Sequence, residues 1–211
     1  GLATSHLPFA LSSYYDAARL IVERTPPVVP TSTQRIRPQD QPMELLMMRL
    51  MAIFHRNVPP AEVATFVAAW DFPSVPPADS ATATVEVAVN GTYAGRPANY
   101  NYSGARAPLR ISTGAFALPG QIITVMVPDE AAGQGLSVQI GAHSDGLWNK
   151  DAIERFPQVI RNDRLRQART ESASVFGGPV YILVPPGSEA PNFVAQISGA
   201  VLAPYFQAGQ T

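Results

Sequence analysis

The stretch ATATVEVAVNGTYAG, residues 81–95, decides the fold class, because its side chains alternate between apolar and small or polar. Val85, Val87 and Val89 recur with the period of two that is typical of a half-buried strand, and Asn90–Gly91 is a strong hairpin signal. Four similar segments follow and are separated by Gly- and Pro-rich breaks: QIITVMVP, LSVQIGAH, PVYILVPP and NFVAQISGAVLAPY. Short strands at this spacing predict an antiparallel β-sandwich over residues 72–211.

Before residue 72 the apolar residues fall at helical spacing, which predicts a small helical domain over residues 1–71 and an α+β fold class overall. One helix is expected over 12–24 and a short one over 59–70. The strongest lies over 40–56, with Asp40 as its cap and Pro42 in its first turn. Its predicted buried stripe consists of Met43, Leu46, Met47, Leu50 and Phe54. We expect this methionine-rich stripe to pack the helices rather than to form an adaptable partner-binding groove.

The charged segment 150–174 is expected to be a long connection with a single helical turn.

Composition excludes several classes of function. The chain has 211 residues, a formal net charge of −1 and no cysteine. The sequence has no basic stripe, so nucleic-acid binding is not expected. It has no cysteine for a disulfide framework and no apolar run long enough for a membrane span. The N-terminus also lacks the residue order of a signal peptide.

Only one of the three histidines has a carboxylate close to it in sequence: His143 lies two residues before Asp145. On a strand these two side chains point to the same side, as a metal pair or a base and its orienter would. Two ligands are too few for a metal, and the neighbouring glycines indicate a turn, so a structural corner is favoured. The sequence contains neither H-E-x-x-H nor G-x-S-x-G, so we predict no catalytic and no metal-binding residue in this chain.

Ligand contact remains the alternative for this segment, through His143, Asp145 and Trp148. Trp148, together with Tyr100 and Tyr102, has the ring chemistry to form an aromatic platform for a sugar, whereas packing is the plainer interpretation of the same residues.

Five segments occur in the order that resembles the N-terminal β-region of the enhancin-like (M-sixty) metallopeptidases. The first is FPSVP at 72–76, and the other four match the family patterns at named positions, with Ser144 in place of threonine in the second of these four. The matching residues are Ser112, Thr113, Gly114, Leu118, Pro119 and Gly120; Ile140, Gly141, Ala142, His143 and Asp145; Phe176, Gly177, Gly178, Tyr181 and Ile182; and Gly199, Ala200, Val201, Ala203, Pro204, Tyr205 and Phe206. Ala115 and the insertion at 90–108 depart from the family pattern.

The resemblance implies a parent protein that is a bacterial zinc metallopeptidase, secreted or on the cell surface, acting on mucin-like glycoproteins. In that family the H-E-x-x-H zinc site lies C-terminal to the β-region, and this chain ends at Thr211, where the catalytic subdomain is expected to begin. No catalytic residue is therefore carried over, and no cofactor is expected in this chain, with zinc expected in the catalytic domain. The expected partners are that domain and a mucin-type glycoprotein or glycan. The alternatives are a free-standing carbohydrate-binding module and a scaffold that has lost peptidase activity.

Overall fold

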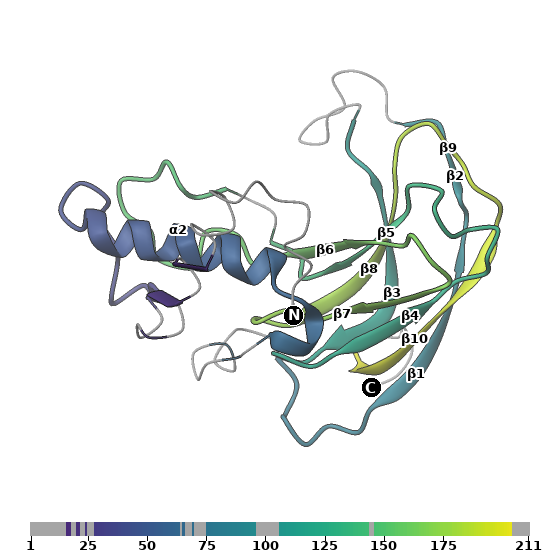
Figure 1. The fold of residues 1–211 in the computed structure, drawn as a ribbon, viewed down its shortest axis with the longest axis horizontal. Helices are drawn as coiled ribbons and strands as arrows, with labels where there is room; N and C mark the ends of the chain where they lie inside the picture. Colours follow the sequence, from purple (N-terminus) through teal and green to yellow (C-terminus); the bar gives the residue numbers. More distant parts are fainter. Residues whose placement is uncertain are drawn as a thin grey trace, which may run out of the picture.

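The computed structural model describes residues 28–63, 75–95, 106–143 and 146–203, and in addition residues 16, 17, 20, 21, 24, 65 and 69. The helical elements with continuous described bounds are α2 (Pro42–Asn57) and the 3₁₀ turn η2 (Pro60–Glu62). The strands are β1 (Ala83–Val89), β2 (Thr92–Tyr93), β3 (Leu109–Ala117), β4 (Ile123–Met126), β5 (Ser137–Ile140), β6 (Arg161–Arg164), β7 (Arg169–Ser172), β8 (Gly178–Val184), β9 (Ser188–Glu189) and β10 (Phe193–Leu202). Helix α2 lies to one side of the strands (Figure 1), and no described helix is long and apolar enough to cross a membrane.

The main sheet is antiparallel throughout and follows the order β6-β5-β8-β3-β10-β4-β7, with β1 paired to β10. Strand β10 is shared by two groups of strands: its first part pairs with β1 and β4, and its last residues pair with β3. The result is one nearly closed, barrel-like sheet. A helix beside a mostly antiparallel sheet agrees with the predicted class, whereas a sandwich of two separate sheets is not confirmed.

Strand β10 changes its partner at Gly199. Ser198 is still paired with Thr124 of β4, whereas Val201 is paired with Phe116 of β3. Gly199 has a φ of 77°, and a Cβ at this position would lie 2.7 Å from the carbonyl oxygen of Ile122. Only glycine meets both conditions without strain, so this residue is what allows one strand to continue from one part of the sheet into the other.

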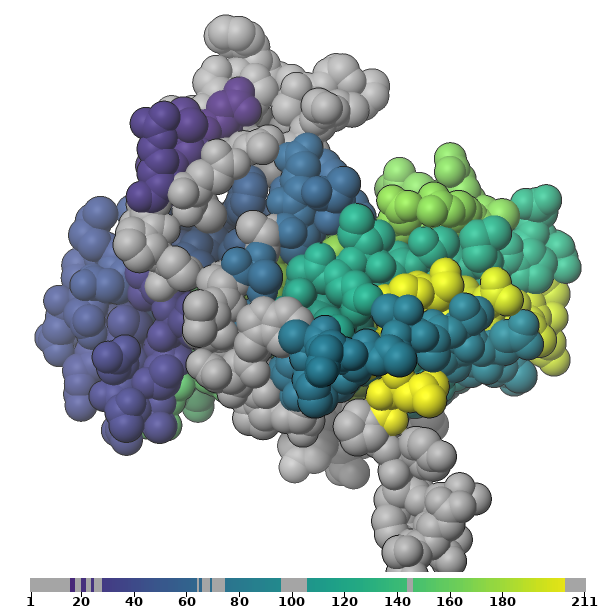
Figure 2. All heavy atoms as spheres, turned by 90° about the horizontal axis from the view of Figure 1, so that it is seen from below, coloured from purple at the N-terminus to yellow at the C-terminus, as the bar shows by residue number. Residues whose placement is uncertain are grey.

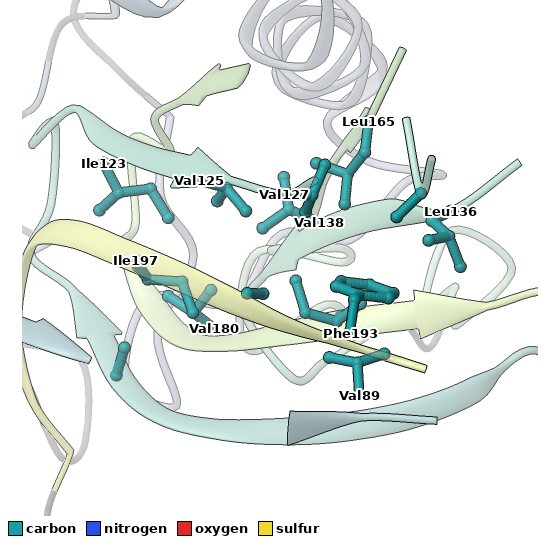
Figure 3. Packing of buried hydrophobic residues seen from close by; sticks show 14 of the residues in the cluster. Val89, Ile123, Val125, Val127, Leu136, Val138, Leu165, Val180, Phe193 and Ile197 are labelled. Carbon is teal, nitrogen blue, oxygen red and sulfur yellow. The ribbon is translucent and has the colours of Figure 1, made fainter. Parts of the chain in front are cut away.

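The barrel interior is filled by apolar side chains from both parts of the sheet. Val125 and Ile197 come from β4 and β10, while Val138 and Val180 come from β5 and β8, and all four are buried (Figure 3). A second apolar cluster packs Met48, Met51 and Ala52 of α2 against the segment around Phe156. The helix is therefore attached to the sheet domain through the chain between β5 and β8. Figure 2 shows the blue residues of the helical part on one side of the teal to yellow residues of the strands.

The predicted hairpin at Asn90–Gly91 is wrong. Val89 pairs with Phe193 of β10, and Thr92 pairs with Glu189 of β9, so β1 and β2 have different partners. Asn90 uses its side-chain Oδ1 to accept a hydrogen bond of 2.9 Å from the Thr92 N–H, which redirects the chain. The local turn signal was genuine, but long-range pairing with the segment 188–194 determined the partners.

The predicted connection over 150–174 is also wrong, because this segment contains strands β6 and β7. The apolar alternation that marks a strand is missing here, since the inward side chains of the two strands are polar. Arg161 and Asp163 of β6 and Ser172 of β7 occupy the inward positions, and Arg164 and Arg169 are exposed. A strand that places polar residues on both faces cannot be recognised by hydrophobic period.

Helix α2 differs from its prediction in its cap and in its buried face. It begins after Gln41, which makes no side-chain capping bond, so the predicted Asp40 cap is wrong. The buried residues are Met48, Met51, Ala52 and Phe54, whereas Met43 and Leu46 of the predicted stripe are exposed. Because α2 carries apolar residues on all sides, its sequence allows more than one stripe and does not decide which one is buried.

Other predictions of the helical part fall mostly outside the described residues. Of the helix over 12–24, the described residues are 16, 17, 20, 21 and 24, and all five are helical. Of the helix over 59–70, the turn Pro60–Glu62 and residue 69 are described as helical. The boundary near residue 72 also lies outside the described residues, so the division into two domains stays a prediction.

Candidate functional site: the strand corner at Gly141 and His143

His143 lies three residues beyond the end of β5, and its side chain is exposed. Its backbone carbonyl accepts a hydrogen bond of 3.3 Å from the Val159 N–H. Ser144 and Asp145 lie outside the described residues, so the spacing between the His143 and Asp145 side chains stays a prediction. What the structure does define at this corner is a set of backbone contacts.

Glycine backbones form these contacts. Gly141 has a φ of 91°, and a Cβ on it would lie 2.3 Å from the Val159 carbonyl oxygen. A Cβ on Gly178 would lie 2.6 Å from the Cα of Gly141. The Gly141 N–H also donates a hydrogen bond of 3.0 Å to the Pro179 carbonyl, and the buried Gln139 side chain donates one of 2.7 Å to the Gly141 carbonyl. The chain at Gly141 therefore meets two other segments, at Val159 and at Gly178, backbone to backbone, with no room for side chains between them.

A third segment joins the same corner. A Cβ on Gly177 would lie 2.4 Å from the Ala117 carbonyl oxygen at the end of β3. The Gly120 N–H donates a hydrogen bond of 2.8 Å to the Ser174 carbonyl. The segments IGAH, FGGP and ALPG, which are far apart in sequence and carry much of the family resemblance, are therefore brought together in space. The close approach of their backbones gives a physical reason for glycine at these positions.

Trp148 lies beside the corner and is half-buried against the α2 cluster. The Arg49 guanidinium carbon lies 5.1 Å from the centroid of its ring, which is a cation–π contact. Phe156 meets the same side chain edge-on at 6.3 Å between ring centroids. These contacts show how Trp148 packs, and its role as a ligand contact stays a prediction, as does a platform with Tyr100 and Tyr102, which lie outside the described residues.

Sequence reasoning missed a buried polar network around Arg161, which is only 4% exposed. Its guanidinium forms a two-pronged ion pair with Asp163, at 2.9 and 3.2 Å. Ser172 of β7 donates a hydrogen bond of 2.6 Å to the same carboxylate. The network joins the two end strands of the sheet path through side chains, and so helps to close the barrel.

The same guanidinium also reaches the C-terminal end of α2. Its Nη1 donates to the carbonyls of Val58 at 2.7 Å and His55 at 3.2 Å. These carbonyls belong to the end of a helix, where backbone acceptors have no partner inside the helix and where positive charge is favourable. Arg161 therefore links the helix to the seam of the sheet. The signal by which sequence reasoning could have found it is the Arg-x-Asp spacing, which places both side chains on the same side of a strand.

His55 is the most perturbed titratable group in the described part of the chain. Burial lowers the pKa of its imidazole to about 4 from the usual value of 6.5, so the side chain is neutral at neutral pH. The described residues do not fit a zinc ion, because no group of three or more His, Asp or Glu side chains among them could hold a metal.

The described part of the chain is thus a mostly antiparallel β domain with an attached helix and a glycine-packed corner. The family model described as the N-terminal domain of M60-like peptidases matches residues 77–198. The chain belongs to this family, and the predicted recognition is confirmed.

Among curated proteins, human TRPM8 channel-associated factor 2 is 37% identical over 101 residues, which cover 48% of this chain and 11% of the relative. Bovine TRPM8 channel-associated factor 1 is 38% identical over 101 residues, which again cover 48% of this chain and 11% of the relative. The match thus spans about a tenth of the length of these relatives. Among solved structures, the IMPa metallopeptidase from Pseudomonas aeruginosa aligns with a TM-score of 0.43 at 15% identity, over 94% of this chain and 20% of that one. A functionally unknown conserved protein from Bacillus anthracis aligns with a TM-score of 0.38 at 17% identity, over 60% and 24%.

Proposed function

We propose that this chain is the N-terminal, non-catalytic part of a secreted or cell-surface zinc metallopeptidase that acts on mucin-like glycoproteins. In this role it supports the catalytic domain and flanks the substrate cleft. The observation that carries the proposal is the family match over residues 77–198, because the matched family is described as the N-terminal domain of M60-like peptidases.

The chemistry of the chain is consistent with a supporting role. A zinc peptidase needs converging ligands and a water-activating carboxylate, for which H-E-x-x-H on a helix is the usual arrangement. The three histidines of this chain are His6, His55 and His143, and none is followed by the required glutamate and second histidine. The proposal therefore assigns the zinc ion and its ligands to the region that follows Thr211.

The packing of the domain also suits a wall beside a cleft. Cleavage requires that a substrate be held in one geometry, and the parts of the enzyme that hold it must not move. The corner formed by Gly141, Gly177 and Gly178, which we call the glycine corner, contributes close backbone contacts, and the Arg161 network fixes α2 to the sheet. A barrel-like sheet closed in this way is a firm support on which a second domain can pack.

The test of the proposal begins with the coding sequence that follows Thr211, which should encode H-E-x-x-H and a later glutamate. The full-length protein should then cleave a mucin-type O-glycoprotein, lose this activity on chelation and regain it with added zinc. Residues 1–211 alone should cleave nothing. Cleavage by residues 1–211, or a full-length protein whose activity persists without zinc, would overturn the proposal.

A scaffold without peptidase activity is the second candidate. It is favoured by the similarity to the TRPM8 channel-associated factors, whose names describe an association with a channel rather than proteolysis. A full-length protein that lacks H-E-x-x-H would support this candidate and would contradict the first.

A further inference from the structure

The outward face of strands β3, β8, β5 and β6, which we call the polar sheet face, carries mostly polar side chains and no carboxylate at the paired positions. Residues paired across neighbouring antiparallel strands point to the same side of the sheet. The register therefore gives two rows across the four strands, which are adjacent in Figure 1. The rows are Arg110–Leu183–Ser137–Arg164 and Ser112–Tyr181–Gln139–Asn162.

The polar sheet face is positively charged at both ends. Arg110 and Arg164 are exposed and lie on the two outer strands, three strand spacings or about 14 Å apart. The ion pairs recorded in the described part of the chain involve other arginines, namely Arg35, Arg161 and Arg169. The guanidinium of Arg110 lies 5.3 Å from the ring centroid of Tyr181, which orients it over the face.

No carboxylate occupies any of the eight positions in these rows. Asp163, the acidic residue of β6, points to the other side of the sheet and is bound by Arg161. The outward face of β1, β10, β4 and β7 differs, because it carries Glu86 and Glu171, and Arg169 there is paired with Glu171 at 2.7 Å. Of the paired positions on the two outward faces, those of the polar sheet face therefore carry arginine without a carboxylate, whereas those of the other face carry both signs of charge.

Between the two arginines the face offers hydrogen-bonding groups rather than apolar surface. Ser112 and Asn162 are exposed and Ser137 is half-buried, and they provide hydroxyl and amide groups, whereas Gln139 in the same rows is buried and its side chain donates to the Gly141 carbonyl. Leu183 is the only large aliphatic side chain in the two rows and is 8% exposed. The buried centre of a protein–protein interface is normally depleted of charge and rich in apolar contacts, which this face is not. Paired hydroxyls and amides beside a half-exposed tyrosine instead suit a ligand rich in hydroxyl groups.

We propose that the polar sheet face binds an acidic carbohydrate chain, with Arg110 and Arg164 on two of its anionic groups. Guanidinium groups recognise carboxylate and sulfate groups with two parallel hydrogen bonds, and a separation of about 14 Å requires an extended ligand with repeated charges. The choice of a carbohydrate rests on the proposed function, in which the substrate is a mucin-like glycoprotein. Bound here, the acidic glycan of a substrate would hold the glycoprotein next to the catalytic domain.

The experiment measures binding of residues 1–211 to immobilised polysialic acid, chondroitin sulfate and neutral dextran at low and at physiological ionic strength. The first two probes separate carboxylate from sulfate as the anionic group. We expect binding to at least one acidic polymer and none to dextran. Arg110→Gln with Arg164→Gln should weaken that binding about tenfold, because each exposed charge contact contributes a few-fold.

Matched controls separate this face from general positive charge. Arg35→Gln with Arg169→Gln removes two exposed arginines elsewhere and should leave the affinity within about twofold. Asn162→Ala should weaken binding to the glycan about threefold but leave binding to poly-glutamate unchanged, since the amide serves sugar hydroxyls. Circular dichroism and urea midpoints equal to those of the wild type establish that the variants are folded.

Three results would overturn the proposal: no binding to either acidic polymer, equal losses in the control pair, or equal affinity for dextran. Poly-glutamate binding that responds to every variant as the glycans do would show an acidic peptide site and would also refute it. Because the measurement uses a chain that needs no peptidase activity, its failure is distinguishable from failure of the proposed function, which depends on zinc-dependent cleavage by the full-length protein.

Discussion

Replacing Gly141 with alanine tests whether the glycine corner is as tightly packed as its geometry indicates. Gly141 has a φ of 91°, and its added Cβ would lie 2.3 Å from the Val159 carbonyl oxygen, a backbone atom that cannot rotate away. A side chain at this backbone conformation costs about 1–2 kcal/mol. Moving the two segments apart would also weaken the bonds Gly141 N–H to Pro179 and Val159 N–H to His143, at about 1 kcal/mol each. The free energy of unfolding should therefore fall by about 3–4 kcal/mol.

Gly187→Ala is the matched control. Gly187 has a φ of 78°, but no atom lies within 4 Å of the Cβ that alanine would add. Gly187→Ala should therefore lower the free energy of unfolding only through the unfavourable backbone conformation, by about 1–2 kcal/mol. Urea unfolding followed by circular dichroism measures both variants, and the midpoint for Gly141→Ala should fall by about 1–2 M, with the slope unchanged. If Gly141→Ala proves no more destabilising than Gly187→Ala, the close packing at the corner contributes nothing and the reasoning is refuted.

Three further predictions use the same unfolding assay. Arg161→Met should lower the free energy of unfolding by about 3 kcal/mol, because it leaves the partly buried carboxylate of Asp163 without its cation. Arg169→Met removes an exposed ion pair and should lower it by less than about 1 kcal/mol. Equal losses in the two variants would contradict the role of Arg161. The lowered pKa of His55 means that the unfolded chain binds this proton more readily, so stability should fall as the pH drops from 6.5 to about 4, by up to about 3 kcal/mol. His55→Gln should make that pH dependence shallower, and an unchanged dependence would show that another group is responsible. Trp148→Ala should cost about 2 kcal/mol through lost packing, and Trp148→Phe less than half of that; loss of glycan binding at full stability would instead support a ligand role for Trp148.

The sequence predicted strands at β1, β4, β5, β8 and β10, whose inward side chains are apolar, but its hydrophobic pattern did not predict β3. Val85 and Val87 of β1 follow the period of two, and so do Val138 and Ile140 of β5, which are fully buried. The hydrophobic period of two did not predict β6 and β7, because the sheet is closed there by a polar network whose members lie far apart in sequence. No local window contains the information that Arg161 meets the end of α2 more than 100 residues earlier in the chain.

Two other errors have the same origin in long-range packing. Asn90–Gly91 satisfies a local turn rule, yet the partner of each flanking strand comes from a segment about 100 residues away. Helix α2 is apolar on several sides, so its contact with the Phe156 cluster, rather than its own pattern, selects Met48 and Met51 for burial. At the corner, the family motifs contain the glycines that the close backbone approach requires, whereas hydrophobic periodicity carries no information about them.

The rate of cleavage with and without this chain tests the central claim most directly. Specificity constants for a mucin-type O-glycoprotein can be measured for the full-length protein, for the region that follows Thr211, and for residues 1–211. If this chain supports the catalytic domain, kcat/KM of the isolated downstream region should be at least about tenfold below that of the full-length protein, because the substrate and catalytic groups are less well positioned. Residues 1–211 should show no cleavage. An isolated downstream region as active as the full-length protein would contradict the account.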